Sequence, residues 1–294
     1  MPFFYAALGV IAVLTGWVLI DIGVALTKIP LPDLPKKPRD SSGVTMLHEV
    51  LHRPESLPDT VVIDEQFIAE CLRPTVAYTN ARYDCADFGL LFLMRFYLEH
   101  KDRLPEGSRE TVKQTFLNFK YWMDEPGSDS MCFWSENHQI MFAVSEYLAG
   151  MTWPDEIFVN NGMTGEQHKA KALERIHIWM EQRFLYGFSE WYSNNYYAED
   201  IAPMANYIQF SDDQESVEKM KIVFDLLWFD VATHSVNNTF VASSSRMYAG
   251  NKSSDKNGNS IRNEIKAIWN GATAKTLNDE AGETAFDVNG AQFK

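Results

Sequence analysis

The sequence contains very little cysteine. Its only cysteines, Cys71, Cys85 and Cys132, form an odd set with no Cys-x-x-Cys spacing. A disulfide framework is typically built from an even set, and a thiolate zinc site from closely spaced pairs, so neither is indicated. A single disulfide with one free thiol stays open as an alternative.

Positive charge is also scarce. The chain has 26 lysines and arginines against 40 aspartates and glutamates, and its formal net charge is −14 at pH 7. Because phosphate binding needs a concentrated basic surface, this balance argues against nucleic acid as a partner. The same charge opposes a polyanionic substrate unless the binding groove is locally basic.

The sequence has no alternation of strands with helices. Its apolar residues, 46% of the 294-residue chain, follow helical spacing instead and are numerous enough for a large core. Helices are predicted at residues 60–72, 84–100, 108–123, 137–150, 164–186, 201–210 and 213–234, the first being closed by Pro74. Successive helical hairpins predict an all-α fold, arranged as an (α/α) toroid or a partial toroid.

Both ends of the chain differ in composition from this helical body. Residues 1–27 are nearly all apolar and are long enough to cross a hydrocarbon core of about 30 Å, which predicts a signal peptide or membrane anchor. Residues 28–59 are predicted to be a linker, 60–248 a helical domain of catalytic type, and 249–294 a polar, weakly structured segment. The basic residues after the apolar run favour a cytoplasmic body: Lys28, Lys36, Lys37 and Arg39.

Residues 133–142, Phe-Trp-Ser-Glu-Asn-His-Gln-Ile-Met-Phe, place polar groups at the start of a helix. Ser135 is a suitable N-cap, so Asn137 and His138 fall in the first turn. If consecutive helices are antiparallel, the polar segments 80–87, 187–200 and 236–248 reach the same end. We therefore expect one shared concave site. The alternative is that Asn137 and His138 only satisfy local backbone groups and that the other segments are ordinary polar loops.

The residues of these segments suit one reaction, in which a uronic acid loses its C5 proton and expels the sugar at C4. The residues expected to catalyse it are Asn137, His138, Arg246 and Tyr248. The amide and guanidinium groups would neutralise the carboxylate as negative charge develops. His138 would remove the proton and Tyr248 protonate the leaving oxygen, or Tyr248 would do both, depending on the sugar face presented. No metal or other cofactor is required.

The order of these motifs resembles the toroidal (α/α) polysaccharide lyases that act on alginate and glucuronan. The motifs are Ser135-Glu-Asn-His138, Ser189-Glu-Trp-Tyr-Ser-Asn-Asn195 and Ser245-Arg-Met-Tyr248, and the resemblance covers residues 81–248. It implies β-elimination of a uronate polymer by an enzyme that is secreted, or membrane-anchored with its body outside the cytoplasm. The chain has fewer hairpins than a complete toroid, which indicates a truncated member.

Further residues of the same segments are expected to bind the polysaccharide: Arg82, Trp134, Glu136, Glu190, Trp191, Tyr192, Asn194, Asn195 and His234. Aromatic rings can stack on sugars, although core packing is their commoner use. Glu136 and Glu190 also fit a second function, glycoside hydrolysis on the same helical scaffold. A third is a non-catalytic glycan-binding protein, tethered to a membrane only through its N-terminal segment.

Overall fold

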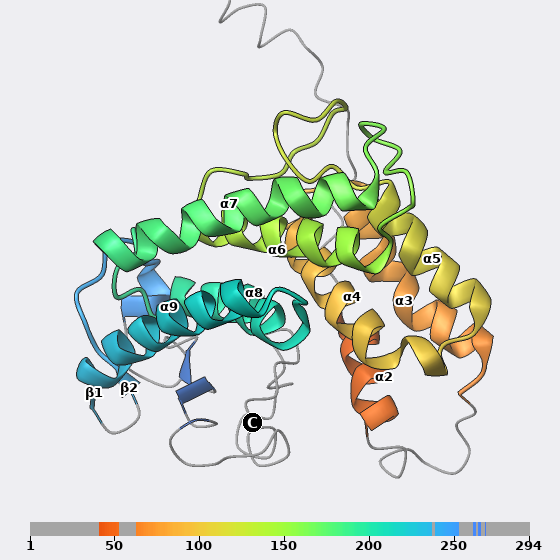
Figure 1. The fold of residues 1–294 in the computed structure, drawn as a ribbon. Helices are drawn as coiled ribbons and strands as arrows, with labels where there is room; N and C mark the ends of the chain where they lie inside the picture. Colours follow the sequence, from red (N-terminus) through yellow and green to blue (C-terminus); the bar gives the residue numbers. More distant parts are fainter. Residues whose placement is uncertain are drawn as a thin grey trace, which may run out of the picture. The chain divides into compact units, whose positions relative to one another are not determined.

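The computed structural model describes residues 41–52, 63–236, 239–252, 261, 262, 264, 265 and 268, all within the compact unit Arg39–Lys294. The predicted signal peptide or anchor and the first part of the predicted linker lie outside the described residues. Among the described residues, regular structure is helical except for one short pair of strands, which confirms the all-α class (Figure 1). No helix in this part is long and apolar enough to span a bilayer.

The helices follow one another along the chain, joined by short and long loops. In chain order they are α2 (Ser42–His52), α3 (Glu65–Asn80), α4 (Ala86–His100), α5 (Glu106–Leu117), α6 (Glu136–Thr152), α7 (Gly165–Tyr186), α8 (Tyr196–Phe210) and α9 (Gln214–Thr233). Short 3-10 helices cover Lys101–Arg103 and Ala249–Lys252. The antiparallel strands are β1 (Ser235–Val236) and β2 (Thr239–Phe240).

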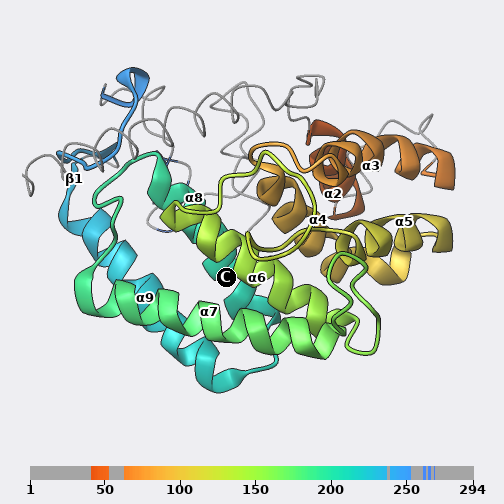
Figure 2. The same cartoon turned by 90° about the horizontal axis from the view of Figure 1, so that it is seen from above.

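Helix α6 occupies the centre of the core. It packs against α4, α7 and α8, and α7 runs alongside it (Figures 1 and 2). Apolar and polar residues around its whole circumference are buried, as expected for a helix with neighbours on several sides. Gly150 allows α7 to approach closely, because a Cβ atom there would lie 2.3 Å from the Gly165 carbonyl oxygen.

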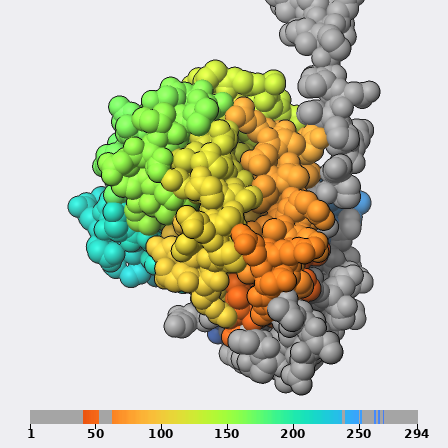
Figure 3. Space-filling view, turned by 90° about the vertical axis from the view of Figure 1, so that its right-hand side faces the viewer, coloured from red at the N-terminus to blue at the C-terminus, as the bar shows by residue number. Residues whose placement is uncertain are grey.

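Several predicted helix boundaries are wrong, including the start of α8, which lies at Tyr196 and not at residue 201. Helix α3 continues through Pro74 to Asn80, because Thr75 and Thr79 pack against Gly89 of α4. A Cβ at Gly89 would lie 2.8 Å from the Thr79 hydroxyl. Helix α5 ends at Leu117, before the predicted end at residue 123. Helices α3 and α5 lie side by side on the face seen in Figure 3.

Segments predicted to lack packed structure contribute to the core at both ends. Residues 42–52, placed by the sequence in a linker, form α2, whose Val44 and Leu47 are fully buried. Ile261 and Ile265, in the segment predicted to be weakly structured, are fully buried too. Their apolar side chains fill space that the main helices leave, so the linker and tail assignments are corrected at these positions.

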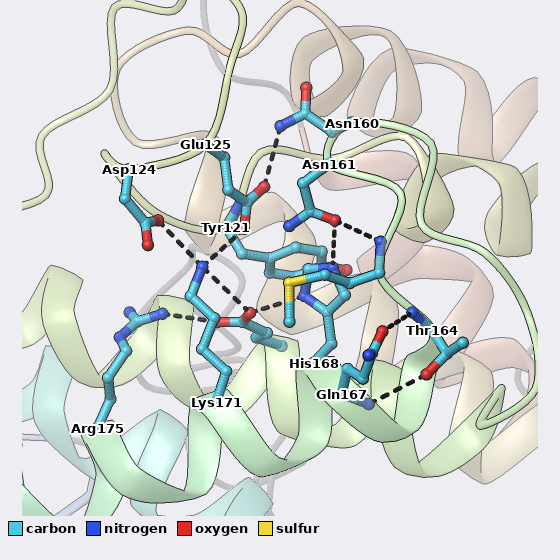
Figure 4. Close-up of polar contacts among 12 residues, drawn as sticks. Tyr121, Asp124, Glu125, Asn160, Asn161, Thr164, Gln167, His168, Lys171 and Arg175 are labelled. Carbon is cyan, nitrogen blue, oxygen red and sulfur yellow. Dashed lines mark hydrogen bonds and ion pairs between the residues drawn. The ribbon is translucent and has the colours of Figure 1, made fainter.

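A buried ionic network attaches the loop after α5 to α6 and α7 (Figure 4). The fully buried Glu146 carboxylate lies 2.7 Å from His168 Nδ1 and 2.6 Å from Arg175 Nη1. Lys171 Nζ lies 3.0 Å from Asp124 and 3.3 Å from Glu125 in that loop. Charges this deeply buried are tolerated only when paired, so the network fixes the loop position.

Replacing Glu146 with alanine should lower the free energy of unfolding by about 3–5 kcal/mol, because Arg175 would keep its charge in a largely buried site without its partner. Urea denaturation followed by circular dichroism measures the change. Glu181→Ala, at an exposed position of α7, is the matched control and should change stability by about 0.5 kcal/mol or less. Equal effects of the two substitutions would contradict this account of the network.

Candidate functional site at the start of helix α6

The motif that contains Asn137 and His138 begins helix α6, as the sequence predicts. Ser135 stands at the N-cap position with extended backbone, but its hydroxyl donates to Asn137 Oδ1 at 2.7 Å and makes no backbone cap. Asn137 Nδ2 donates to Glu199 Oε2 at 2.6 Å. Asn137 therefore connects the start of α6 to the first turn of α8.

His138 is held by the first turn of α4. Its Nδ1 atom lies 2.5 Å from Oδ2 of Asp87, a fully buried carboxylate. Burial alone would lower the pKa of His138, but hydrogen bonds with Asp87 and Cys85 raise it to about 11. At neutral pH, His138 is therefore an imidazolium ion paired with Asp87.

The carboxylate of Glu136 fixes the loop between α7 and α8 against the same helix start. Glu136 Oε2 accepts hydrogen bonds from the Ser189 backbone N–H at 2.6 Å and from the Ser189 hydroxyl at 2.7 Å. Arg183 Nη1 lies 3.0 Å from the same oxygen. The Glu190 N–H also donates to Glu136 Oε1 at 3.4 Å, so the buried carboxylate is engaged by four donors and anchors the loop.

The segment with Arg246 and Tyr248 lies along this loop. Ser245 N–H donates to the Trp191 carbonyl oxygen at 3.2 Å, and the Ser193 hydroxyl donates to the Arg246 carbonyl oxygen at 2.7 Å. Arg246 Nη1 lies 2.5 Å from Glu190 Oε1. The two backbone contacts set the register of the segment, and the ion pair directs the guanidinium toward the loop.

Tyr248 lies in a hydrogen-bonded group with Tyr196 and Arg246. Its hydroxyl oxygen accepts from the Tyr196 hydroxyl at 2.7 Å and from Arg246 Nη2 at 3.5 Å. The Arg246 guanidinium carbon also lies 3.9 Å from the centre of the Tyr196 ring, a cation–π contact. Hydrogen bonds from Tyr196 and Arg246 lower the pKa of Tyr248, whereas burial raises the pKa of Tyr196.

Glu190 and Glu199 connect the two pairs of predicted catalytic residues. Glu190 binds Arg246 directly. Burial and the neighbouring Glu136 raise the pKa of the Glu190 carboxyl overall, and the charge of His138 acts in the opposite direction. Glu199 binds Asn137, and its charge acts on Tyr248. Glu190 N–H also donates to Glu136 Oε1 at 3.4 Å, so the two pairs, a hundred residues apart in sequence, belong to one polar cluster.

Of the predicted binding residues, the asparagines and His234 have structural contacts. Asn194 Nδ2 donates to the Asn251 carbonyl oxygen at 3.0 Å, and Asn195 Oδ1 accepts from Asn251 Nδ2 at 3.4 Å. His234 ends α9, where its Nδ1 lies 2.8 Å from the Asp230 carbonyl oxygen and its ring lies 4.2 Å from that of Tyr192. Trp134 and Trp191 are instead 73% and 44% exposed.

Arg82 does not join this cluster, contrary to the sequence-based expectation. Its Nη2 atom donates to the Asn118 carbonyl oxygen at 2.7 Å and to Asn160 Oδ1 at 3.0 Å. It lines a separate cavity of about 920 Å³ near α5. Arg82 has a left-handed backbone, φ 53°, in the turn before α4, and its side chain binds the loops that follow α5 and α6.

Sequence reasoning assigned no role to Asp87, the partner of His138. A carboxylate at the start of a helix that the sequence predicts to be largely buried was the available signal, since buried charges are generally paired. Asp84, Cys85 and His138 also present ligand-type atoms within 4.8 Å of one another. A metal would require a neutral imidazole there, and the raised pKa of His138 opposes that.

Asp200 adds a buried acid beside the cluster. It is fully buried, and neither of its carboxyl oxygens has a hydrogen-bond partner in the described part of the chain. Burial, reinforced by the charges of Glu136 and Glu190, raises its pKa well above the ordinary value. Asp200 therefore keeps its proton to a higher pH than an exposed aspartate does.

Asp200→Asn should stabilise the protein increasingly as pH rises from 4 to 8. The native carboxyl keeps its proton to a higher pH than the unfolded one, which ionises above about 3.8, so wild-type stability falls as pH rises through that interval, and asparagine removes this loss. Urea denaturation at several pH values measures the difference. Asp225→Asn, at an exposed position of α9, is the control. A difference from wild type that is independent of pH would contradict a raised pKa of Asp200.

Asp87→Asn should lower the pKa of His138 by several units, toward or below the ordinary 6.5, because burial then acts without the neighbouring negative charge. Imidazole NMR during a pH titration measures it, with the signal assigned by its loss in His138→Gln. A wild-type His138 that titrates near 6.5 would contradict the charged pair.

Comparison of the chain with protein-family models, curated proteins and solved structures gives no match. The resemblance to the toroidal lyases therefore remains a prediction that rests on the three motifs. A function for the cluster has to be argued from its own contacts and charges.

Proposed function

We propose that the chain is a polysaccharide lyase that cleaves a uronic-acid-containing polysaccharide by β-elimination. The observation that carries the proposal is the grouping of two cations and a phenol around Glu190 and Glu199. The cations are His138 and Arg246, and the phenol is Tyr248, whose pKa is lowered. This grouping supplies cationic side chains at the site of an otherwise acidic chain, each held by a carboxylate.

The positive groups would neutralise the substrate carboxylate. Loss of the C5 proton places negative charge on the carbon next to that carboxylate, so cationic donors favour the transition state over the ground state. Arg246 is suited to this task, because its side chain is 44% exposed and keeps a face toward solvent while Glu190 holds it. The His138 imidazolium would add a positive charge at the start of α6, and the Asn137 amide, which donates to Glu199, would hold that carboxylate in place.

Tyr248 would transfer the proton. As a phenolate it removes the C5 hydrogen, the C5–H electrons form the C4–C5 double bond, and the C4–O bond breaks with its electron pair on the glycosidic oxygen. That oxygen takes the proton from the Tyr248 hydroxyl, which restores the phenolate. The hydrogen bonds from Tyr196 and Arg246 favour ionisation of Tyr248.

His138 takes a different role in this proposal from the base predicted by the sequence. An imidazolium ion bound to Asp87 has no lone pair with which to accept the C5 proton. Of the two assignments compatible with the sequence, the contacts favour Tyr248 as both base and acid. His138 then serves as a fixed positive charge.

Polymer binding fits the exposed aromatic residues near the cluster. Trp134 precedes the start of α6, and Trp191 lies in the loop anchored by Glu136; both rings are exposed and suit stacking on sugars. We further propose that the helical hairpins form a partial toroid and that the enzyme acts outside the cytoplasm, where structural polysaccharides occur. Glycoside hydrolysis by Glu136 is less well supported, since four donors occupy that carboxylate.

Tyr248→Phe should reduce kcat about 10²–10⁴-fold with little change in KM, the range lost when a general acid–base group is removed. Alginate, glucuronan and related polymers are the substrates, and the ultraviolet absorbance of the unsaturated uronate end is the readout. Tyr186→Phe is the matched control, because Tyr186 is 84% exposed at the end of α7.

The assay separates the three candidate functions. Reducing ends without the unsaturated chromophore would support a hydrolase, and binding without either product would support a glycan-binding protein. A Tyr248→Phe variant as active as Tyr186→Phe would exclude the proton transfer described above.

A further inference from the structure

Helix α2 and the end of α4 bring three histidines and one glutamate together. His48 and His52 lie one turn apart on α2, and Glu99 and His100 end α4. One ligand-type atom from each side chain lies within 4.8 Å of all the others. The sequence-based search for zinc sites considered cysteine spacing and placed residues 28–59 in a linker, so it missed this group.

The distances within the group fit ligands of one metal ion. His100 Nε2 lies 3.1 Å from His48 Nδ1. Glu99 Oε2 lies 3.2 Å from His52 Nε2 and 3.6 Å from His48 Nδ1. Four ligands at tetrahedral angles around Zn²⁺, with bonds of 2.0–2.1 Å, stand roughly 3.3 Å apart. Only small adjustments would be needed to place an ion between these atoms.

The surroundings favour a metal over a charged histidine cluster. His48 and His100 are 1% and 3% exposed, and the rings of His48, His52 and His100 lie 4.4–5.1 Å apart, so protonating them together would bring like charges into contact away from water. Neutral imidazoles are the form that binds transition metals. His52, with its side chain 35% exposed, connects the group to solvent and offers a route for an ion.

Outer contacts orient the glutamate. Arg95 Nη2 lies 2.9 Å from Glu99 Oε1, which leaves Oε2 facing the histidines. Arg95 is itself fixed by hydrogen bonds to Asn206 Oδ1 at 2.9 Å and Gln209 Oε1 at 2.7 Å on α8. Such outer partners set the direction of a metal ligand and are typical of built metal sites.

We propose that His48, His52, Glu99 and His100 bind one zinc ion that fixes α2 to α4. The stretch His48-Glu-Val-Leu-His52 matches the His-Glu-x-x-His pattern, in which two histidines on one helix face bind zinc. In hydrolytic sites of that pattern the fourth position is open to water. Here Glu99 and His100 complete the coordination, so the ion has a structural role, separate from the proposed lyase cluster.

Zinc binding is tested on the full chain after removal of metals with a chelator. Isothermal titration with zinc chloride should give one ion per chain for the wild type. His52→Ala removes a partly exposed ligand. Loss of an outer-shell partner weakens metal binding about 10–100-fold, and we expect the loss of this direct ligand to weaken zinc binding by more than that. His177→Ala, a half-buried histidine on α7 outside the group, is the control and should bind as the wild type does.

Two further measurements make the outcome decisive. Zinc should raise the thermal midpoint of the wild type and of His177→Ala but not that of His52→Ala. Cobalt(II) bound to the wild type should show the intense visible absorption of a tetrahedral ion, and zinc should displace it. Folded wild-type protein that takes up no zinc, an octahedral cobalt spectrum, or unchanged affinity in folded His52→Ala would overturn the proposal.

Discussion

The buried carboxylate of Glu136 is the contact on which the candidate site depends. It stands at the first position of α6 and binds the Ser189 backbone, the Ser189 hydroxyl and Arg183. The loop from α7 to α8 is thereby held against the helix that presents Asn137 and His138. Arg246 and Tyr248 dock on that loop in turn, so the polar cluster exists only while this anchor is in place. An ion at this depth persists because its donors replace the water it has lost.

Charged side chains in the cluster are paired with side chains of opposite charge, although the net charge of the whole chain is negative. Asp87 is matched by His138 and Glu190 by Arg246, while burial raises the pKa of Asp200 and so favours its uncharged form. Each pairing lowers the cost of burying its members. Of these groups, Arg246 and Tyr248 remain partly exposed, which makes them the ones that a uronate substrate could reach.

Helix α4 contributes to both polar centres of the molecule. Asp87 in its first turn orients His138, and Glu99 and His100 at its end face the histidines of α2. A helix of this length spans about 20 Å, so the two centres are separate sites on one rigid element. Arg95, between them, binds both Glu99 and α8, which couples the position of α2 to the helices that hold the candidate site.

The sequence by itself determined the helical class and the long helices. Apolar residues at helical spacing, as in 164–186, share one face only if the segment is a helix, and that face can then be buried. It also indicated that Asn137 and His138 begin a helix, since a Ser at the N-cap is a local signal. Tertiary structure alone decided that α3 passes through Pro74, that α2 exists, and which partner each charge receives. Those outcomes depend on side chains far apart in sequence, whose burial and pairing no local pattern encodes. The partnership of His138 with Asp87 is the clearest case, because it changes a predicted base into a fixed cation.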